Sequence, residues 1–386
     1  MHAATRTALS GGLVSVLLSA PAAATATDPV QSAEAVLIEH ADEGSFPRYE
    51  IGGLIASGYQ FEIGTDSENQ AGALTVRPAI SAFLSESDEL FLEFGITQAN
   101  AVNADSPFSL APWGADLEDD LENINGSDVD ALQNLWYKRT IGGEALGGFG
   151  DELAITVGFI DSTEFIDQNE FANDEYTQFL NEVFVNSPVS FLQSYDLGAA
   201  VEWSADSWSV NGTVMQVSEN DDGNSFLFAG AQIGYSMTNS IGPANYRLVL
   251  TYANDEFVRP DGVSTAPRLG ALISADQQIG ESVGVWARVG TQDDRAVVTH
   301  QNLYSGGAQM DGSLWGRSQD TAAIGYAFLD GGNDGISSTH AIEAYVRFAL
   351  DTSASLTLDV QRIHDHTLEG TTDEGFVIGG RVVFEF

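Results

Sequence analysis

Hydrophobic and polar residues alternate along most of this chain with a period of two. The pattern begins at Tyr49: every second residue up to Phe61 points one way, and the residues between them, from Glu50 to Glu62, point the other way. Such alternation predicts a β-strand whose two faces meet different surroundings. Ten further stretches repeat it: Leu74–Leu84, Leu90–Ile96, Leu153–Phe159, Leu197–Trp203, Tyr246–Tyr252, Val283–Val289, Ala322–Phe328, Ile342–Phe348, Leu356–Val360 and Phe376–Phe386.

Turn-forming residues separate these stretches. Clusters of Asn, Asp and Gly at 220–224 and 330–335, and Glu369-Gly370 near the C-terminus, favour chain reversals. Strand and turn repeated to the end of the chain predict an antiparallel meander. The spacing fits roughly 14 to 16 strands of a membrane barrel, more than a soluble sandwich needs.

The surroundings of the two strand faces distinguish a membrane barrel from a soluble sheet protein. In a barrel the apolar face meets lipid and the polar face lines a water-filled lumen, whereas in a sandwich the polar face meets solvent. Aromatic residues stand near many strand ends, as in interfacial girdles, and the last strand places Phe376, Phe384 and Phe386 on one face. We therefore predict an all-β fold: a transmembrane antiparallel β-barrel of about 16 strands with an inward-folded constriction loop.

The N-terminal region predicts export. Arg6 precedes a small and apolar run at 8–20, and Ala24 and Ala26 fit cleavage by signal peptidase after Ala26. The expected location is the outer membrane, reached through the periplasm. The expected parts are a signal peptide at 1–26, a short periplasmic segment at 27–48 with a small helix from Val30 to Ile38, and the outer-membrane barrel at 49–386.

Composition excludes several classes of protein. The 386 residues include 56 Asp and Glu against 14 Lys and Arg, a net charge of −42, so no basic surface for nucleic acid is expected. With no cysteine, the chain has no disulfide, thiolate metal ligand or cysteine nucleophile. The acidic composition, with Lys138 as the single lysine, favours a halophilic source in which salt screens the charge.

Three stretches resemble the carbohydrate-selective porin family of the OprB type, which are Gram-negative outer-membrane barrels. The first joins Gly158–Asp161 to Glu164-Phe165 and to Phe179–Asn181, similar to the strand end that leads into the family's inward segment. The second is Ile324–Leu329, and the third runs from Glu343 through the last two strands. Where the family usually reads Leu-Thr-Pro-Asp-Val-Gln-Tyr, residues 356–362 lack the proline and the final tyrosine, so the sugar preference is not carried over with the barrel.

The resemblance implies a sixteen-stranded channel that works without catalysis or a cofactor. Monosaccharides, other small solutes and ions would diffuse through it. The partners to expect are outer-membrane lipid and lipopolysaccharide, the assembly machinery that reads a C-terminal strand ending at Phe386, and further copies of the chain in a homotrimer.

Three other functions stay open. The net charge favours a general cation-preferring porin without sugar specificity. A barrel enzyme finds little support, because the chain shows no nucleophile elbow, phosphate loop, HExxH or Rossmann glycine pattern, and its six histidines are scattered. A secreted, lectin-like binding protein would be soluble without detergent.

Arginines supply most of the candidate pore-lining residues. Those that lie between lipid-facing positions should face the lumen, because arginine costs about 2 to 4 kcal/mol in mid-membrane lipid. There they either merely avoid lipid or form a basic wall that binds sugar hydroxyls opposite acidic loops. Trp286 beside Arg288 could also stack on a sugar ring. The candidate pore-lining and substrate-binding set is Arg77, Glu93, Asp161, Glu164, Arg247, Trp286, Arg288, Arg347 and Arg381.

The remaining polar stretches have separate interpretations. Ser162–Pro188 lacks period two and mixes aromatic with acidic residues, so it is the candidate inward loop, with a rim-shielding cap as the alternative. The acidic run from Asp116 to Glu122 and on to Asp130 predicts a solvated external loop, with calcium bridging to lipopolysaccharide as the alternative. His364-Asp365-His366 predicts an exposed turn in preference to a metal site, and no metal or cofactor is expected.

Overall fold

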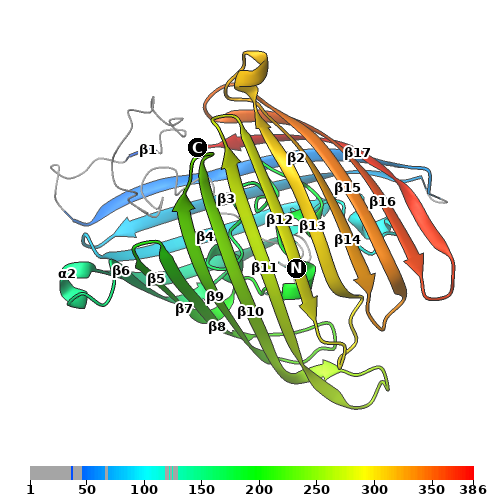
Figure 1. Ribbon diagram of the computed structural model, residues 1–386, viewed down its shortest axis with the longest axis horizontal. Helices are drawn as coiled ribbons and strands as arrows, with labels where there is room; N and C mark the ends of the chain where they lie inside the picture. Colours follow the sequence, from blue (N-terminus) through cyan, green and yellow to red (C-terminus); the bar gives the residue numbers. More distant parts are fainter. Residues whose placement is uncertain (1–35, 38–45, 66–67, 118–120, 122–123, 125–128) are drawn as a thin grey trace.

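Sixteen antiparallel strands, β2 to β17, form the wall of a closed barrel (Figure 1). The computed structural model describes residues 36–37, 46–65, 68–117, 121, 124 and 129–386. Each strand pairs with its sequence neighbour, as predicted for a meander. The strands are β2 (Arg48–Ile63), β3 (Gln70–Phe83), β4 (Asp88–Asn100), β5 (Asp130–Gly142), β6 (Glu152–Ile160), β7 (Asp196–Ala205), β8 (Trp208–Val217), β9 (Phe226–Thr238), β10 (Pro243–Val258), β11 (Thr265–Ile279), β12 (Val283–Gln292), β13 (His300–Asp311), β14 (Thr321–Gly331), β15 (Ile336–Ala349), β16 (Ala354–Thr367) and β17 (Thr372–Glu385).

Pairing between β17 and β2 closes the sheet. Val383 lies opposite Ala56, and the backbone N–H and C=O of Phe386 bond to Gly53 at 3.0 and 2.9 Å. Closure leaves none of these strands with a free edge, which a sheet surrounded by lipid requires. The predicted antiparallel barrel is confirmed.

A two-residue strand, β1 (Val36–Leu37), continues the pairing along β2 beyond the C-terminal end of β17. Its residues lie opposite Ile51 and Glu50. The predicted helix from Val30 to Ile38 is therefore wrong at Val36 and Leu37, where the chain is extended. The rest of that segment and the predicted signal peptide at 1–26 lie outside the described residues.

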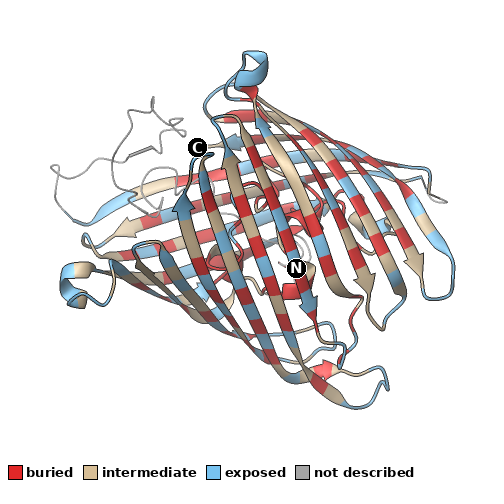
Figure 2. Cartoon of the chain, in the orientation of Figure 1, coloured by how far each residue is buried: buried red, intermediate tan, exposed pale blue. Residues whose placement is uncertain are grey.

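The two faces of the wall differ along every strand, and buried and exposed positions alternate in Figure 2. Outward-facing Leu250, Ile324 and Leu358 are each more than half exposed to solvent in the isolated chain. A continuous apolar band of this kind meets lipid in a membrane barrel. Inward positions such as Arg77 and Glu343 are polar and buried inside the barrel.

The barrel has a turn end, where short connections join the strands, and a loop end, which carries the two long connections at 101–129 and 161–195. Among the described residues, no helix has the length and apolar character needed to cross a membrane. The short helices whose bounds fall within the described residues are α2 (Gly143–Leu146) and η4 (Gly312–Trp315) at the turn end, and η1 (Asn103–Asp105), η2 (Ser162–Glu164), α3 (Glu182–Val185) and η3 (Pro188–Ser190) in the long connections.

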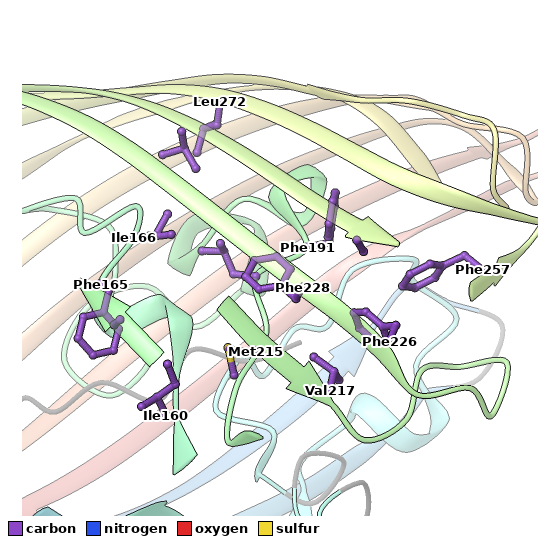
Figure 3. Close-up of a cluster of buried hydrophobic side chains, with 14 of the residues drawn as sticks. Ile160, Phe165, Ile166, Phe191, Met215, Val217, Phe226, Phe228, Phe257 and Leu272 are labelled. Atoms are coloured by element: carbon purple, nitrogen blue, oxygen red, sulfur yellow. The ribbon is translucent and has the colours of Figure 1, made fainter. Parts of the chain in front are cut away.

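A hydrophobic core lies inside the barrel, between the 161–195 connection and the wall. Phe165, Ile166 and Phe191 come from the connection, and they pack with side chains of β8 to β11 that include Met215 and Phe228 (Figure 3). This packing fills one side of the lumen with protein. The aqueous space is therefore limited to what the inward segments leave open.

Candidate functional site

The connection between β6 and β7, residues 161–195, folds into the barrel as predicted from Ser162–Pro188. Its polar and aromatic residues do not merely shield the rim, because Tyr176, Phe179 and Phe184 are fully buried against the inner wall. We call this connection the first inward segment. Its N-terminal end is fixed by Asp161, whose carboxylate accepts bonds from the Thr163 N–H at 2.8 Å, the Thr163 hydroxyl and the Ser194 hydroxyl. Burial raises the pKa of Asp161 to about 6, although these hydrogen bonds oppose the shift.

One side of the first inward segment is attached to the wall through Arg288 on β12. Its Nε lies 3.0 Å from a carboxylate oxygen of Asp167, and its other nitrogens donate to the carbonyls of Ala172 and Phe184 at 2.5 and 3.0 Å. Neither Arg288 nor Asp167 is exposed. The guanidinium suits this position because its several N–H donors can satisfy a carboxylate and two carbonyls together.

The segment is also attached to the wall through Glu343 and Arg381, on β15 and β17. The Glu343 carboxylate accepts the N–H groups of Leu180 and Asn181 at 2.6 and 2.8 Å. Arg381 donates to the carbonyls of Gln178, at 2.9 Å, and Glu175. The carboxylate accepts hydrogen bonds from backbone N–H groups, and the guanidinium donates to backbone carbonyls. Together they satisfy the polar backbone of a segment that has little regular secondary structure.

A second inward segment, residues 101–117 between β4 and β5, packs against the first. The N–H of Gly114 donates to the carbonyl of Leu180 at 2.5 Å, and Trp113 is buried over Gly58. Ser109 is bound to Asp365 on β16, through its N–H at 2.7 Å and its hydroxyl at 3.0 Å. The sequence did not indicate this segment.

The predicted solvated external loop is wrong at its start. Asp116 is 5% exposed and Leu117 is 3% exposed, and the Asp116 carboxylate accepts from Asn100 and Asn103 at 3.2 and 2.7 Å. Leu121 is buried as well. Asp116 is drawn inside with Ala115 and Leu117, which are buried in an apolar environment. Residues 118–120, 122–123 and 125–128 lie outside the described part of the chain.

The structure places the five candidate arginines on the inner face, three of them in ion pairs. Arg77 contacts Glu93 at 2.7 Å, and Glu93 also accepts from Asn134 at 3.0 Å. Arg247 contacts Asp276 at 2.5 Å at the turn end. Arg347 and Glu164 are half-buried. The candidate residues are thus spread over the wall and the first inward segment and do not form a single cluster.

The expectation that Trp286 and Arg288 hold a sugar is wrong for this arrangement. Trp286 is 4% exposed and meets the rings of Phe179 and Phe184 edge-on at 5.8 and 6.0 Å. Arg288 is occupied by Asp167 and backbone carbonyls. Both side chains lie beneath the first inward segment, so they support it and are closed to a solute.

The predicted exposed turn at His364-Asp365-His366 is also wrong, because these residues belong to β16. Asp365 points inward and is 1% exposed, whereas the two imidazoles are half-buried on the outer face. Within the described residues, no group of three or more His, Asp or Glu side chains is arranged to hold a metal.

Ser109 and His300 come together in the lumen, with Oγ and Nε2 3.3 Å apart. A hydrolase triad would need a carboxylate to orient the imidazole. Here Asp365 instead accepts from the serine itself and from Thr339. The cluster therefore resembles a structural attachment of the second inward segment and lacks the geometry of a nucleophile.

Two polar cavities flank the inward segments. The loop-end cavity, of about 300 Å³, is lined by Ser109, Glu182, Asp221, Arg268 and His300 among others. The turn-end cavity, of about 430 Å³, is lined by residues that include Glu152, Glu170, Asp174, Glu202 and Arg247. Sequence reasoning missed Arg268, His300 and Ser109, although the alternation around Leu269 and Ile273 would have placed Arg268 on the inner face.

The model of the carbohydrate-selective porin family, OprB family, matches residues 117–386. The chain belongs to this family. Its barrel is similar to the high-pH structure of Pseudomonas putida OprB, with a TM-score of 0.67, 15% identity and coverage of 88% of this chain and 94% of that one. It is also similar to the outer membrane channel DcaP of Acinetobacter baumannii, with a TM-score of 0.55, 8% identity and coverage of 90% and 99%.

A relative of the chain shares more of its sequence. An uncharacterized protein of Aquifex aeolicus (strain VF5) is 25% identical over 326 residues, which cover 81% of this chain and 87% of the relative. Family and fold together make this OprB-family porin an outer-membrane channel rather than an enzyme.

Proposed function

We propose that this porin lets small hydrophilic solutes diffuse passively across the outer membrane, with monosaccharides as the main class. The observation that carries the proposal is the pair of inward segments, which are attached to the wall by buried polar contacts and leave a polar cavity on each side. Because ligand cavities generally range from about 300 to 1,000 Å³, the loop-end cavity suits a single sugar ring better than a longer chain.

The contacts of the segments explain how such a channel would select by size. Arg288, Glu343 and Arg381 form hydrogen bonds with the backbone of the first inward segment. The width of the open lumen beside that segment is therefore determined by a backbone that is fixed to the wall, and it does not depend on mobile side chains. A solute would pass only if it could exchange its water for the hydroxyl, amide and charged groups that line the cavities.

A general cation-preferring porin is the second candidate. The turn-end cavity has four carboxylates on its wall, those of Glu152, Glu170, Asp174 and Glu202, and Arg247 as its arginine. A lumen lined by one sign of charge concentrates ions of the opposite sign. Cation preference and sugar passage are compatible, so the question is whether sugars bind.

Single-channel recording in a planar lipid bilayer tests both candidates. Wild-type protein should give stepwise conductance, and added glucose should reduce it in a saturable manner. Conductance with cation preference and no glucose block would support the general porin. The folded barrel should be verified beforehand by its heat-modifiable mobility on a gel.

We also propose the export route and partners that the family suggests. A signal peptide at 1–26 would be removed in the periplasm, ahead of a short periplasmic segment at 27–48 and the barrel at 49–386. The C-terminal strand ending at Phe386 would be read by the assembly machinery, and the outer face would meet lipid, lipopolysaccharide and two further copies in a homotrimer. Cross-linking in detergent tests the trimer.

A further inference from the structure

Arg268 occupies a distinctive position at the loop end. It lies on the inner face of β11, and its guanidinium carbon is 4.5 Å from the ring centre of Phe191 and 5.3 Å from that of Phe257. Figure 3 shows these two rings among the side chains that line this part of the barrel. One ring comes from the first inward segment and the other from β10, so segment and wall together hold the guanidinium in place.

The guanidinium keeps donors available. Its Nη2 donates to Gln292 at 2.7 Å, and Gln292 in turn donates to the carbonyl of His300 at 2.7 Å. An arginine has five N–H donors, and within the described part of the chain Gln292 is the hydrogen-bond partner of Arg268. Arg288, by contrast, is saturated by the first inward segment.

The loop-end cavity in front of Arg268 has two kinds of wall. Hydroxyl and imidazole groups of Ser109, Thr163 and His300 line it, and apolar side chains of Val185 and Leu192 line it too. A sugar ring has the matching surfaces, because hydroxyls project from its edge and C–H groups cover its faces.

The charges around the cavity favour an uncharged ligand. Asp221 and Glu182 line the same space as Arg268. A carboxylate on the solute would gain one guanidinium but would face two negative charges, whereas neutral hydroxyls can accept from Arg268 and donate to the acids.

We propose that this loop-end cavity, with Arg268 as its main donor, is a binding site for one uncharged sugar ring before it enters the narrow region between the inward segments. The proposal rests on the proposed function, since it names a place where the same solute first binds. Arg268 binds the ligand directly, and Phe191 and Phe257 position it.

Glucose block of single-channel conductance tests the site in the full-length barrel. Arg268→Gln should weaken glucose binding about tenfold, because it removes hydrogen bonds from a charged donor. Arg268→Lys keeps the charge but loses the planar fork of donors, so its affinity for glucose should lie between those of the wild type and Arg268→Gln. The matched control is Arg139→Gln, which removes the same charge from an exposed pair with Asp88 at the turn end, away from the cavity, and should leave binding within about twofold.

The possible outcomes distinguish a failure of the Arg268 site from a failure of the proposed sugar transport. Unchanged glucose block in Arg268→Gln, with the wild type blocked, would overturn the Arg268 site and leave sugar transport intact. Absence of block in the wild type would overturn sugar transport itself. Glucuronate binding the wild type more tightly than glucose would overturn the choice of an uncharged ligand; this comparison needs no variant, so it decides even if Arg268→Gln does not fold.

Discussion

Arg288 and Asp167 form an ion pair inside the barrel in which neither side chain is exposed and the nearest N–O distance is 3.0 Å. The partners are 121 residues apart in the chain, one on the wall and one on the first inward segment. Charges removed from water in this way are tolerated when they are paired and further hydrogen-bonded, which the carbonyls of Ala172 and Phe184 provide. The pair thus fixes a segment that has little regular structure of its own.

Replacing Arg288 by Met should destabilise the protein by about 3 to 5 kcal/mol, because Asp167 would be left buried without a cation. Denaturant unfolding in detergent measures the stability, and single-channel recording should show larger and noisier currents as the segment loosens. Adding Asp167→Asn should restore part of the stability, since asparagine tolerates the φ of +59° at this position. A quiet channel with stability within about 1 kcal/mol of wild type would show that the pair does not hold the segment.

Gly58 provides the space for the second inward segment. A Cβ there would lie 2.2 Å from the ring of Trp113. Gly58→Val should therefore displace Trp113, cost about 1 to 3 kcal/mol in stability and increase conductance. The control is Gly380→Val on the neighbouring β17, where a Cβ finds its nearest atoms at 3.7 and 3.8 Å. Equal behaviour of the two variants would rule out the steric argument.

The sequence predicted the barrel because lipid and lumen impose opposite demands on neighbouring residues. Strands with large outward side chains, such as β10 with Leu248 and Leu250, show the alternation clearly. Five strands, β5, β8, β9, β11 and β13, were not recognised as alternating. Small outward residues such as Ala229, Ala231 and Ala271 weaken the contrast that identifies a strand.

The site was less predictable than the wall. Alternation places Arg77, Arg247 and Arg381 on the inner face, yet it cannot tell a side chain that faces the solute from one that lies beneath an inward segment. Arg288 and Trp286 are of the second kind because residues more than 100 positions away cover them. The second inward segment was missed for a similar reason: the acidic run that begins at Asp116 indicated solvent, while Asp116 and the neighbouring Leu117 are buried inside the barrel.

A charged substitution on the outward face of β16 tests whether that face meets lipid. Leu358→Arg, at an outward position that is 53% exposed in the isolated chain, should cost about 2 to 4 kcal/mol in lipid and reduce assembly of the heat-modifiable form. Leu368→Arg is the matched control, because Leu368 is similarly exposed but lies in the connection between β16 and β17. Assembly into lipid vesicles should separate the two variants; equal yields would contradict a lipid-facing band at Leu358.

The buried carboxyl of Asp161 predicts a pH dependence of stability. Burial raises its pKa from 3.8 to about 6 in the folded protein, against the hydrogen bonds from Thr163 and Ser194. The folded state then holds the proton more tightly than the unfolded state, so stability is greatest below pH 3.8 and is lost as the pH rises towards 6. A shift of this size corresponds to about 3 kcal/mol.

Asp161→Asn removes that ionisation and keeps an oxygen that can accept from the Thr163 N–H. Its stability relative to wild type should therefore rise by up to about 3 kcal/mol between pH 4 and pH 7, measured by denaturant unfolding in detergent at each pH. Asp261→Asn is the control with the opposite sign: hydrogen bonds from Ser264 and Val263 lower the pKa of Asp261 to about 2, so its contribution changes only below pH 4. If the Asp161→Asn difference is as flat as that of Asp261→Asn across pH 4 to 7, Asp161 is not held as a buried acid at the start of the first inward segment.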